Sequence, residues 1–199
     1  MCCRVLPMKR DDPQRGFKIA AGMIKAGLAR PSDFDGVLPD FDKPAGERCQ
    51  HQRHDGCQVY ALRPMGCRYW NCRWLVDEAG DTSRPDRAGY VIDVMPDLIT
   101  VVGEDGERTN VEVIQIWVDP KRPDAWRDNA LFDYLERRGS EGKAALIRFN
   151  SSDAVTLLPP SMSADRRWHE IAPGTVRPER TPEELFEGLA QCYKPEGRS

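Results

Sequence analysis

Cysteine and histidine are the residues of this chain whose types and spacing could do chemistry, and they gather in one short stretch. Residues 49–74 hold two of the three histidines and four of the seven cysteines, at C-x7-C-x9-C-x4-C spacing: Cys49, Cys57, Cys67 and Cys72. Four thiolates suit a tetrahedral zinc ion or an iron–sulfur cluster. The spacing lacks the paired C-x2-C motifs of a standard zinc ribbon. Glycine and proline between the cysteines let the chain double back, so that several sulfurs could point at one ion.

An adjacent pair, Cys2 and Cys3, precedes this quartet. Neighbouring side chains diverge on an extended backbone, so the pair suits two different centres, or a bridge within a multinuclear cluster, better than one small ion. His51 and His54 are nitrogen donors of the kind that zinc accepts. They lie in the polar stretch HQRHDG, where solvent exposure is the favoured interpretation and metal ligation the alternative.

Every cysteine also has a purely structural interpretation, as a small buried apolar side chain. We favour it for Cys192, which stands alone near the end of the chain, but not for six cysteines in two clusters. The start of the chain has no apolar secretory signal, and an odd cysteine count argues against a disulfide framework. We therefore expect a cytoplasmic protein whose thiols stay reduced.

Charge divides the chain unevenly. Residues 1–75 carry 13 Lys and Arg against 8 Asp and Glu, whereas the remainder carries 16 against 24, for a net charge of −3. Basic surroundings favour the metal-binding thiolate, and an ordinary basic surface is the equal alternative. The negative total and the lack of a nucleic-acid motif argue against a nucleic-acid partner. No run of about 18 apolar residues occurs, so we expect no membrane partner.

The motif GCQVYALRPMGCR, followed by YWNC, resembles the signature of the YkgJ-type cysteine-cluster family, whose members are zinc- or iron-chelating proteins. Its pattern G-C-x2-Y-x2-R-P-x2-C-R is matched without a gap by Gly56, Cys57, Tyr60, Arg63, Pro64, Cys67 and Arg68, and a further cysteine follows. The stretch KPAGERC (43–49) resembles the lead-in to this motif. The resemblance covers about residues 1–75. It implies zinc or iron, possibly as an iron–sulfur cluster, held by Cys2, Cys3, Cys49, Cys57, Cys67 and Cys72.

The sequence departs from the family pattern at two places. A C-x2-C-x2-CC motif is characteristic of the family, but here Met1 stands directly before Cys2 and Cys3. Either two ligands are lost or the natural start lies upstream, and we expect the second, with a further Cys-x2-Cys encoded in frame. Gln52 stands where some relatives carry another cysteine, which counts against a ligand role for this loop.

The arginines of the motif have two possible roles. Arg63 and Arg68 could donate charged hydrogen bonds to thiolates and so neutralise a site whose ligands outnumber the charge of the metal. Alternatively, Arg63 caps backbone carbonyls in a tight loop that Pro64 helps to fix. Tyr60, Arg63 and Arg68 are therefore expected next to the metal ligands rather than among them.

The elements that must position these residues indicate an α+β fold. We expect a loop-rich, metal-stapled cysteine module over residues 1–76, with an inserted helix at about 13–29 and a polar boundary at 77–89. Residues 88–199 predict a small mixed β-sheet packed with helices, in one compact unit with the module. Short β-branched runs predict strands at 90–94, 98–102, 111–118, 144–150 and 154–159, and imperfect alternation predicts burial of 111–118 on both faces. Helices are predicted at 123–139, with Gly139 as the stop, and from Thr181 to about residue 191.

These features predict a metal-binding protein, with no catalytic residue identified. One rival is an iron-dependent redox or methyl-transfer enzyme, because the flagellin lysine N-methylases resemble this cysteine pattern. The sequence has no glycine-rich methyl-donor loop after a strand, which ranks this rival lower. Another rival is a metal-stapled interaction module whose sheet, at about 90–160, binds a protein partner.

Overall fold

The computed structural model describes residues 5–8, 21–27, 29–38, 41–64, 67, 70–94, 97–102, 106–150 and 152–171. Outside these residues lie Cys2, Cys3, Arg68, Cys192 and the helix predicted after Thr181. Of the helix predicted at 13–29, residues 21–25 are described and helical, and Gly27 follows with a φ of 73°. No helix in the described part of the chain has both the length and the apolar character that a bilayer crossing requires.

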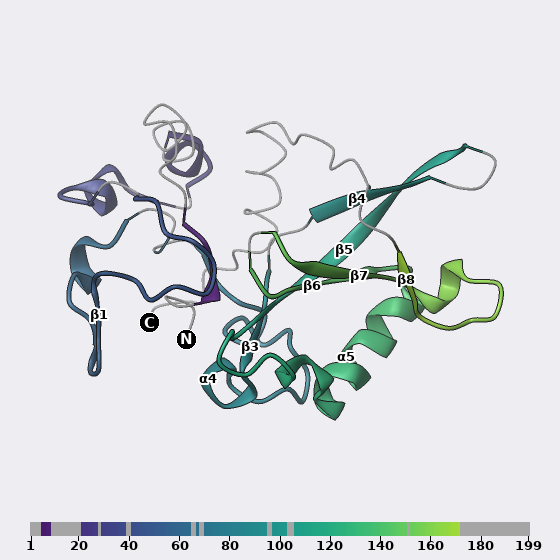
Figure 1. Ribbon diagram of the computed structural model, residues 1–199. Coiled ribbons are helices and arrows are strands. Elements are labelled where there is room, and N and C mark those ends of the chain that lie inside the picture. Colours follow the sequence, from purple (N-terminus) through teal and green to yellow (C-terminus); the bar gives the residue numbers. More distant parts are fainter. Residues whose placement is uncertain are drawn as a thin grey trace.

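A mixed β-sheet forms the centre of the structure (Figure 1). Its strands are β3 (Tyr90–Ile92), β4 (Asp97–Val102), β5 (Arg108–Val118), β6 (Ala144–Arg148), β7 (Ala154–Leu158) and β8 (His169–Ile171). The order is β3-β5-β6-β7-β8, and β4 pairs with the first half of β5. β5 and β6 run parallel, and the other neighbours antiparallel. The predicted α+β class is confirmed, whereas β8 is a strand that the sequence pattern missed.

β5 is buried on both faces, as its imperfect alternation predicts. From Val111 to Val118 every residue except Glu112 is buried. Cross-strand register places Trp117 opposite Val91 and Ile116 opposite Ile92, so odd and even positions of β5 face opposite layers. The strand is therefore the shared wall of two cores.

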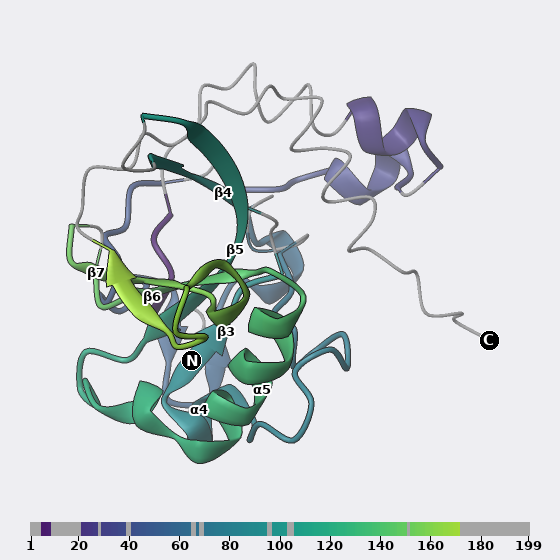
Figure 2. The ribbon, with the colours of Figure 1, turned by 90° about the vertical axis from the view of Figure 1, so that its right-hand side faces the viewer.

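Helix α5 (Asn129–Ser140) covers the even-numbered face of β5 (Figures 1 and 2). Its buried residues Leu131, Tyr134 and Leu135 pack in one cluster with residues of β3, β5 and β6. The predicted start at residue 123 is wrong, because Ala125–Arg127 form a 3-10 turn and Asp128 caps the helix by accepting from the Ala130 amide. The predicted stop is wrong too, because the helix runs one residue past Gly139.

The opposite face of the sheet meets the N-terminal part of the chain. Val5, Ala45 and Cys72 form a buried cluster with Val91 of β3 and Trp117 of β5. Farther along the same face lies a second buried apolar cluster, made of Ile99, Val111, Val113, Ala144 and Leu146. The cysteine-bearing part and the sheet therefore share a core.

Short elements and loops make up the described cysteine-bearing part. Besides the helical residues 21–25, the elements there are η1 (Pro31–Phe34), β1 (Gln52–Arg53), β2 (Gly56–Cys57) and η2 (Tyr60–Leu62). β1 and β2 form a hairpin at the left edge of Figure 1, on the side away from β5. This part is loop-rich, as expected.

The polar stretch predicted as a boundary, 77–89, also packs onto the sheet. Ala79 is 2% exposed and joins the cluster beneath α5, and Thr82 is buried. The short helix α4 (Pro85–Ala88) ends at Gly89, which has a φ of 86° and leads directly into β3. The stretch therefore connects the two parts through packed residues.

Candidate metal centre

Cys72 lies against the end of β3 and not in an isolated loop. It forms an antiparallel bridge with Asp93, and the Arg73 amide donates to the Ile92 carbonyl at 3.0 Å. This bond flanks the bridge, so Cys72 and Asp93 are a non-hydrogen-bonded pair, the kind in which the two side chains are closest and share one face. Both residues are buried, with exposed fractions of 5% and 7%.

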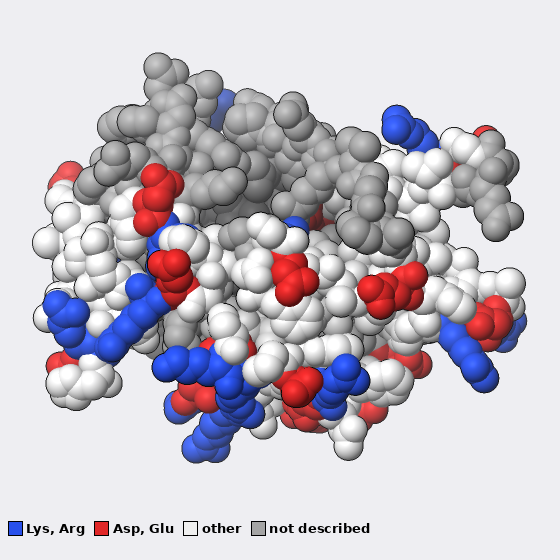
Figure 3. All heavy atoms as spheres, in the orientation of Figure 1, with Lys and Arg blue, Asp and Glu red and all other residues white. Residues whose placement is uncertain are grey.

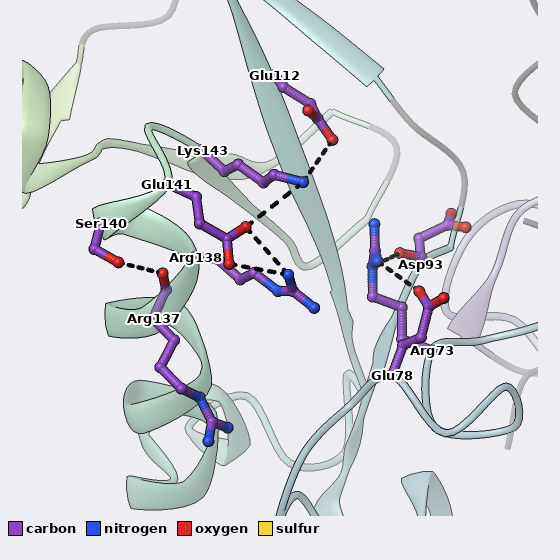
Figure 4. Close-up of polar contacts among 9 residues, drawn as sticks. All are labelled: Arg73, Glu78, Asp93, Glu112, Arg137, Arg138, Ser140, Glu141 and Lys143. Atoms are coloured by element: carbon purple, nitrogen blue, oxygen red, sulfur yellow. Dashed lines mark hydrogen bonds and ion pairs between the residues drawn. The ribbon is translucent and has the colours of Figure 1, made fainter. Parts of the chain in front are cut away.

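Two tryptophans orient the carboxylate of Asp93. The indole Nε1 of Trp70 donates to Oδ1 at 2.9 Å, and that of Trp117 donates to Oδ2 at 3.3 Å. Such bonds offset part of the cost of burying the charged carboxylate. Arg73 holds the backbone here, donating from Nε to the Asp93 carbonyl at 3.1 Å and pairing with Glu78 at 2.9 Å (Figure 4). The thiol of Cys72 therefore lies beside a fixed, buried carboxylate.

The segment at residues 5–8 runs alongside the segment that leads to Cys49. Met8 and Lys43 exchange backbone hydrogen bonds of 2.8 and 2.7 Å, and the Gly46 amide donates to the Val5 carbonyl at 3.0 Å. The buried Lys43 ammonium donates to the carbonyls of Pro44 and Glu47. Val5, 1% exposed, packs in the same cluster as Cys72.

The hairpin around Cys57 forms a second environment for a thiol. Cys57 of β2 pairs with Gln52 of β1, and the Gln52 amide donates to the Cys49 carbonyl at 3.0 Å. The side-chain oxygen of Gln52 is buried and has no hydrogen-bond donor in the described part of the chain. Cys49 and Cys57 are half-buried.

The two histidines have different surroundings. The half-buried His51 packs edge-on against Phe41, with ring centroids 5.5 Å apart, and its Nε2 lies 3.2 Å from the Gln50 amide nitrogen. His54 is exposed in the turn between β1 and β2, where the favoured sequence interpretation placed it. Neither histidine belongs to a metal-binding group among the described residues.

The Arg63 side chain is engaged with its own loop. Its guanidinium stacks 3.9 Å from the centre of the Tyr60 ring and donates to the Tyr60 carbonyl at 3.4 Å. The Cys67 amide donates to the Pro64 carbonyl at 2.9 Å, which continues the turn. These contacts match the loop-capping alternative for Arg63; Tyr60 itself is 68% exposed.

The described residues do not by themselves complete a metal site. All four described cysteines are thiols and not disulfides. No three His, Cys, Asp or Glu side chains in the described ranges are grouped so that they could hold a metal ion. The convergence of six cysteines stays a prediction, because Cys2 and Cys3 lie outside the described residues.

A polar cluster on the same sheet face was missed by the sequence interpretation. The Gln115 amide donates to the Asp97 carboxylate at 2.8 Å and accepts from Arg148 Nε at 2.9 Å. The Arg148 guanidinium lies 5.2 Å from the Trp117 ring centre.

Asp93 was also missed by the sequence interpretation. The signal that could have found it is an acid directly after the apolar run YVI, where a strand ends.

Charges are mixed in sign on one face of the molecule. On the face drawn in Figure 3, acidic and basic side chains alternate among the coloured residues without a broad area of one sign. The resemblance to a known family rests on the motif between Gly56 and Arg68. No protein-family model, curated protein or solved structure matches this chain.

Proposed function

We propose that this protein binds zinc or iron through cysteine thiolates of its N-terminal part, and that it belongs to the YkgJ-type family. One observation carries the proposal: the segments at residues 5–8 and 43–46 and Cys72 meet in or beside one buried cluster. Cys3 stands two positions before Val5, and Cys49 three positions after Gly46. Since two residues span at most about 7 Å, the chain allows the N-terminal sulfurs to reach the surroundings of Cys72.

The donor set fits the proposed metals. Thiolate sulfur, with carboxylate oxygen available beside it, is chemistry that zinc and iron both accept. The burial of Cys72 in an apolar cluster would shield a bound ion from water. When bound, zinc would act as a structural staple or Lewis acid, and iron would add redox chemistry. Cys2 and Cys3 are part of the proposal because the described residues alone supply no group of three ligands.

Metal content tests the proposal directly. Protein purified without oxygen would be analysed for zinc and iron, and its visible spectrum recorded, because an iron–sulfur cluster is brown and a zinc protein colourless. We expect at least one metal ion per chain in the wild type. Cys3→Ser and Cys72→Ser should each lose metal, and Cys192→Ser, the matched control outside both clusters, should keep it. Metal-free wild-type protein, or unchanged metal content in both variants, would refute the proposal.

A further inference from the structure

We infer that Asp93 binds the metal as an oxygen ligand beside Cys72, an inference that rests on the proposed function. The sequence motif places every candidate ligand in the first 75 residues, whereas Asp93 follows β3 in the second part of the chain. The site would then be built from both parts, with a mixed sulfur and oxygen donor set. Three features of Asp93 support this: its pairing, its orientation and its burial.

Pairing places the two donor groups at a suitable separation. In a non-hydrogen-bonded antiparallel pair, the Cβ atoms lie about 5 Å apart and the side chains leave the same face. Zinc binds thiolate sulfur at about 2.3 Å and carboxylate oxygen at about 2.1 Å, so the two donors of a tetrahedral site lie about 3.6 Å apart. Cys72 and Asp93 form a pair of this kind, and side chains that start about 5 Å apart on one face can both reach one ion.

Orientation and burial make the carboxylate a good ligand. The indoles of Trp70 and Trp117 each donate one hydrogen bond to the carboxylate, one to each oxygen, and so fix its orientation. Metal-binding carboxylates are themselves commonly held by hydrogen-bond donors of this kind. Because Asp93 is only 7% exposed, its attraction to a cation is screened less than at the surface.

Cobalt offers a test that does not depend on any activity. Metal-free protein would be titrated anaerobically with Co²⁺, whose sulfur-to-cobalt absorption counts thiolate ligands and whose d–d bands report the complete donor set. Asp93→Asn keeps the side-chain shape and removes the charge. Asp119→Asn is the matched control, because Asp119 is 2% exposed, follows β5 and accepts from the Lys121 amide at 3.1 Å.

We expect Asp93→Asn to weaken Co²⁺ binding about 10- to 100-fold, to shift the d–d bands and to keep the sulfur band. Asp119→Asn should bind as the wild type does. Melting temperatures with cobalt and with chelator separate ligation from folding: loss of a ligand shrinks the metal-dependent rise, whereas a purely structural role lowers both temperatures equally. If Asp93→Asn does not fold, Asp93→Glu is used as the test variant. We then expect its d–d bands to shift and its sulfur band to stay unchanged.

The outcomes separate this inference from the proposed function. Wild-type protein that binds no Co²⁺ would overturn both. If the wild type binds Co²⁺ with a sulfur band, and Asp93→Asn or Asp93→Glu binds it with the same affinity and the same d–d bands, only the role of Asp93 is overturned. An equal loss of melting temperature with and without metal in Asp93→Asn would likewise assign Asp93 to structure alone.

Discussion

Val5 should hold the segment at residues 5–8, which follows Cys3, against the sheet. Its side chain is 1% exposed and packs with Cys72, Val91 and Trp117. Val5→Ala removes two methyl groups, worth about 1.6 kcal/mol of burial. The cavity left behind raises the cost to about 2 kcal/mol. Because the backbone hydrogen bonds that join Val5 and Met8 to residues 43–46 are few, we expect this cost to favour local opening more than global unfolding.

Hydrogen exchange measured by NMR would detect that opening. The amides of Met8, Lys43 and Gly46 donate the backbone hydrogen bonds between these two segments, so their exchange should quicken about 30-fold in Val5→Ala, the factor that 2 kcal/mol represents. The control is Val118→Ala, also 1% exposed but beneath α5 in the other cluster. It should lower global stability by a similar amount without a selective effect on these three amides. Wild-type exchange at Met8 and Lys43 in Val5→Ala would refute the anchoring role.

Two further predictions concern α5 and its contacts. Burial, and then the hydrogen bond to Asp128, raise the pKa of Tyr90 well above its usual value of about 10. Above pH 10 the unfolded state therefore releases the Tyr90 proton while the folded state keeps it, so stability falls as pH rises. Urea unfolding between pH 9 and 11 should show a shallower loss in Tyr90→Phe; an unchanged slope would contradict the assignment. Gly139→Ala would put a Cβ 2.5 Å from the Trp168 ring, so we expect a loss of about 1–3 kcal/mol where Ala in a helix normally stabilises. A higher melting temperature would contradict this, and Trp168→Leu in the same chain should restore part of the loss.

Local sequence pattern was enough to find most of the sheet. The runs at 90–92, 98–102, 144–148 and 154–158 are strands, because β-branched and apolar residues follow one another there between turn residues. β5 begins three residues earlier than predicted, at Arg108. Its polar start is held by pairing with β4, including a bond from the Thr100 hydroxyl to the Asn110 side chain. Such pairing depends on a partner strand, which a local pattern does not contain.

The errors at α5 have the same origin. Trp126 lies within the helix predicted at 123–139, but it packs against the core from a 3-10 turn, and the carboxylate of Asp128 caps the helix that begins after it. Gly139 looked like a stop, yet it lies within the helix, where its missing side chain makes room for Trp168. Contacts with residues distant in sequence therefore decide how Trp126 packs and why Gly139 lies within the helix.

The candidate site shows the limit more sharply. The clustering of cysteines was visible in the sequence, but the pairing of Cys72 with Asp93 joins residues 21 positions apart. Nothing in the sequence around Trp70 or Trp117 indicates that its indole donates to a carboxylate. The sequence therefore pointed to thiol chemistry, and although the acid after the run YVI marks the end of a strand, no local pattern placed it beside Cys72.

The double burial of β5 limits how this protein can evolve. Inserting or deleting one residue between Val111 and Val118 would turn every later side chain to the opposite layer. Trp117 would then face α5, and Ile116 would face Asp93 and Cys72. Both layers would be mispacked at once, so length variants should be rare in this strand even where single substitutions are tolerated.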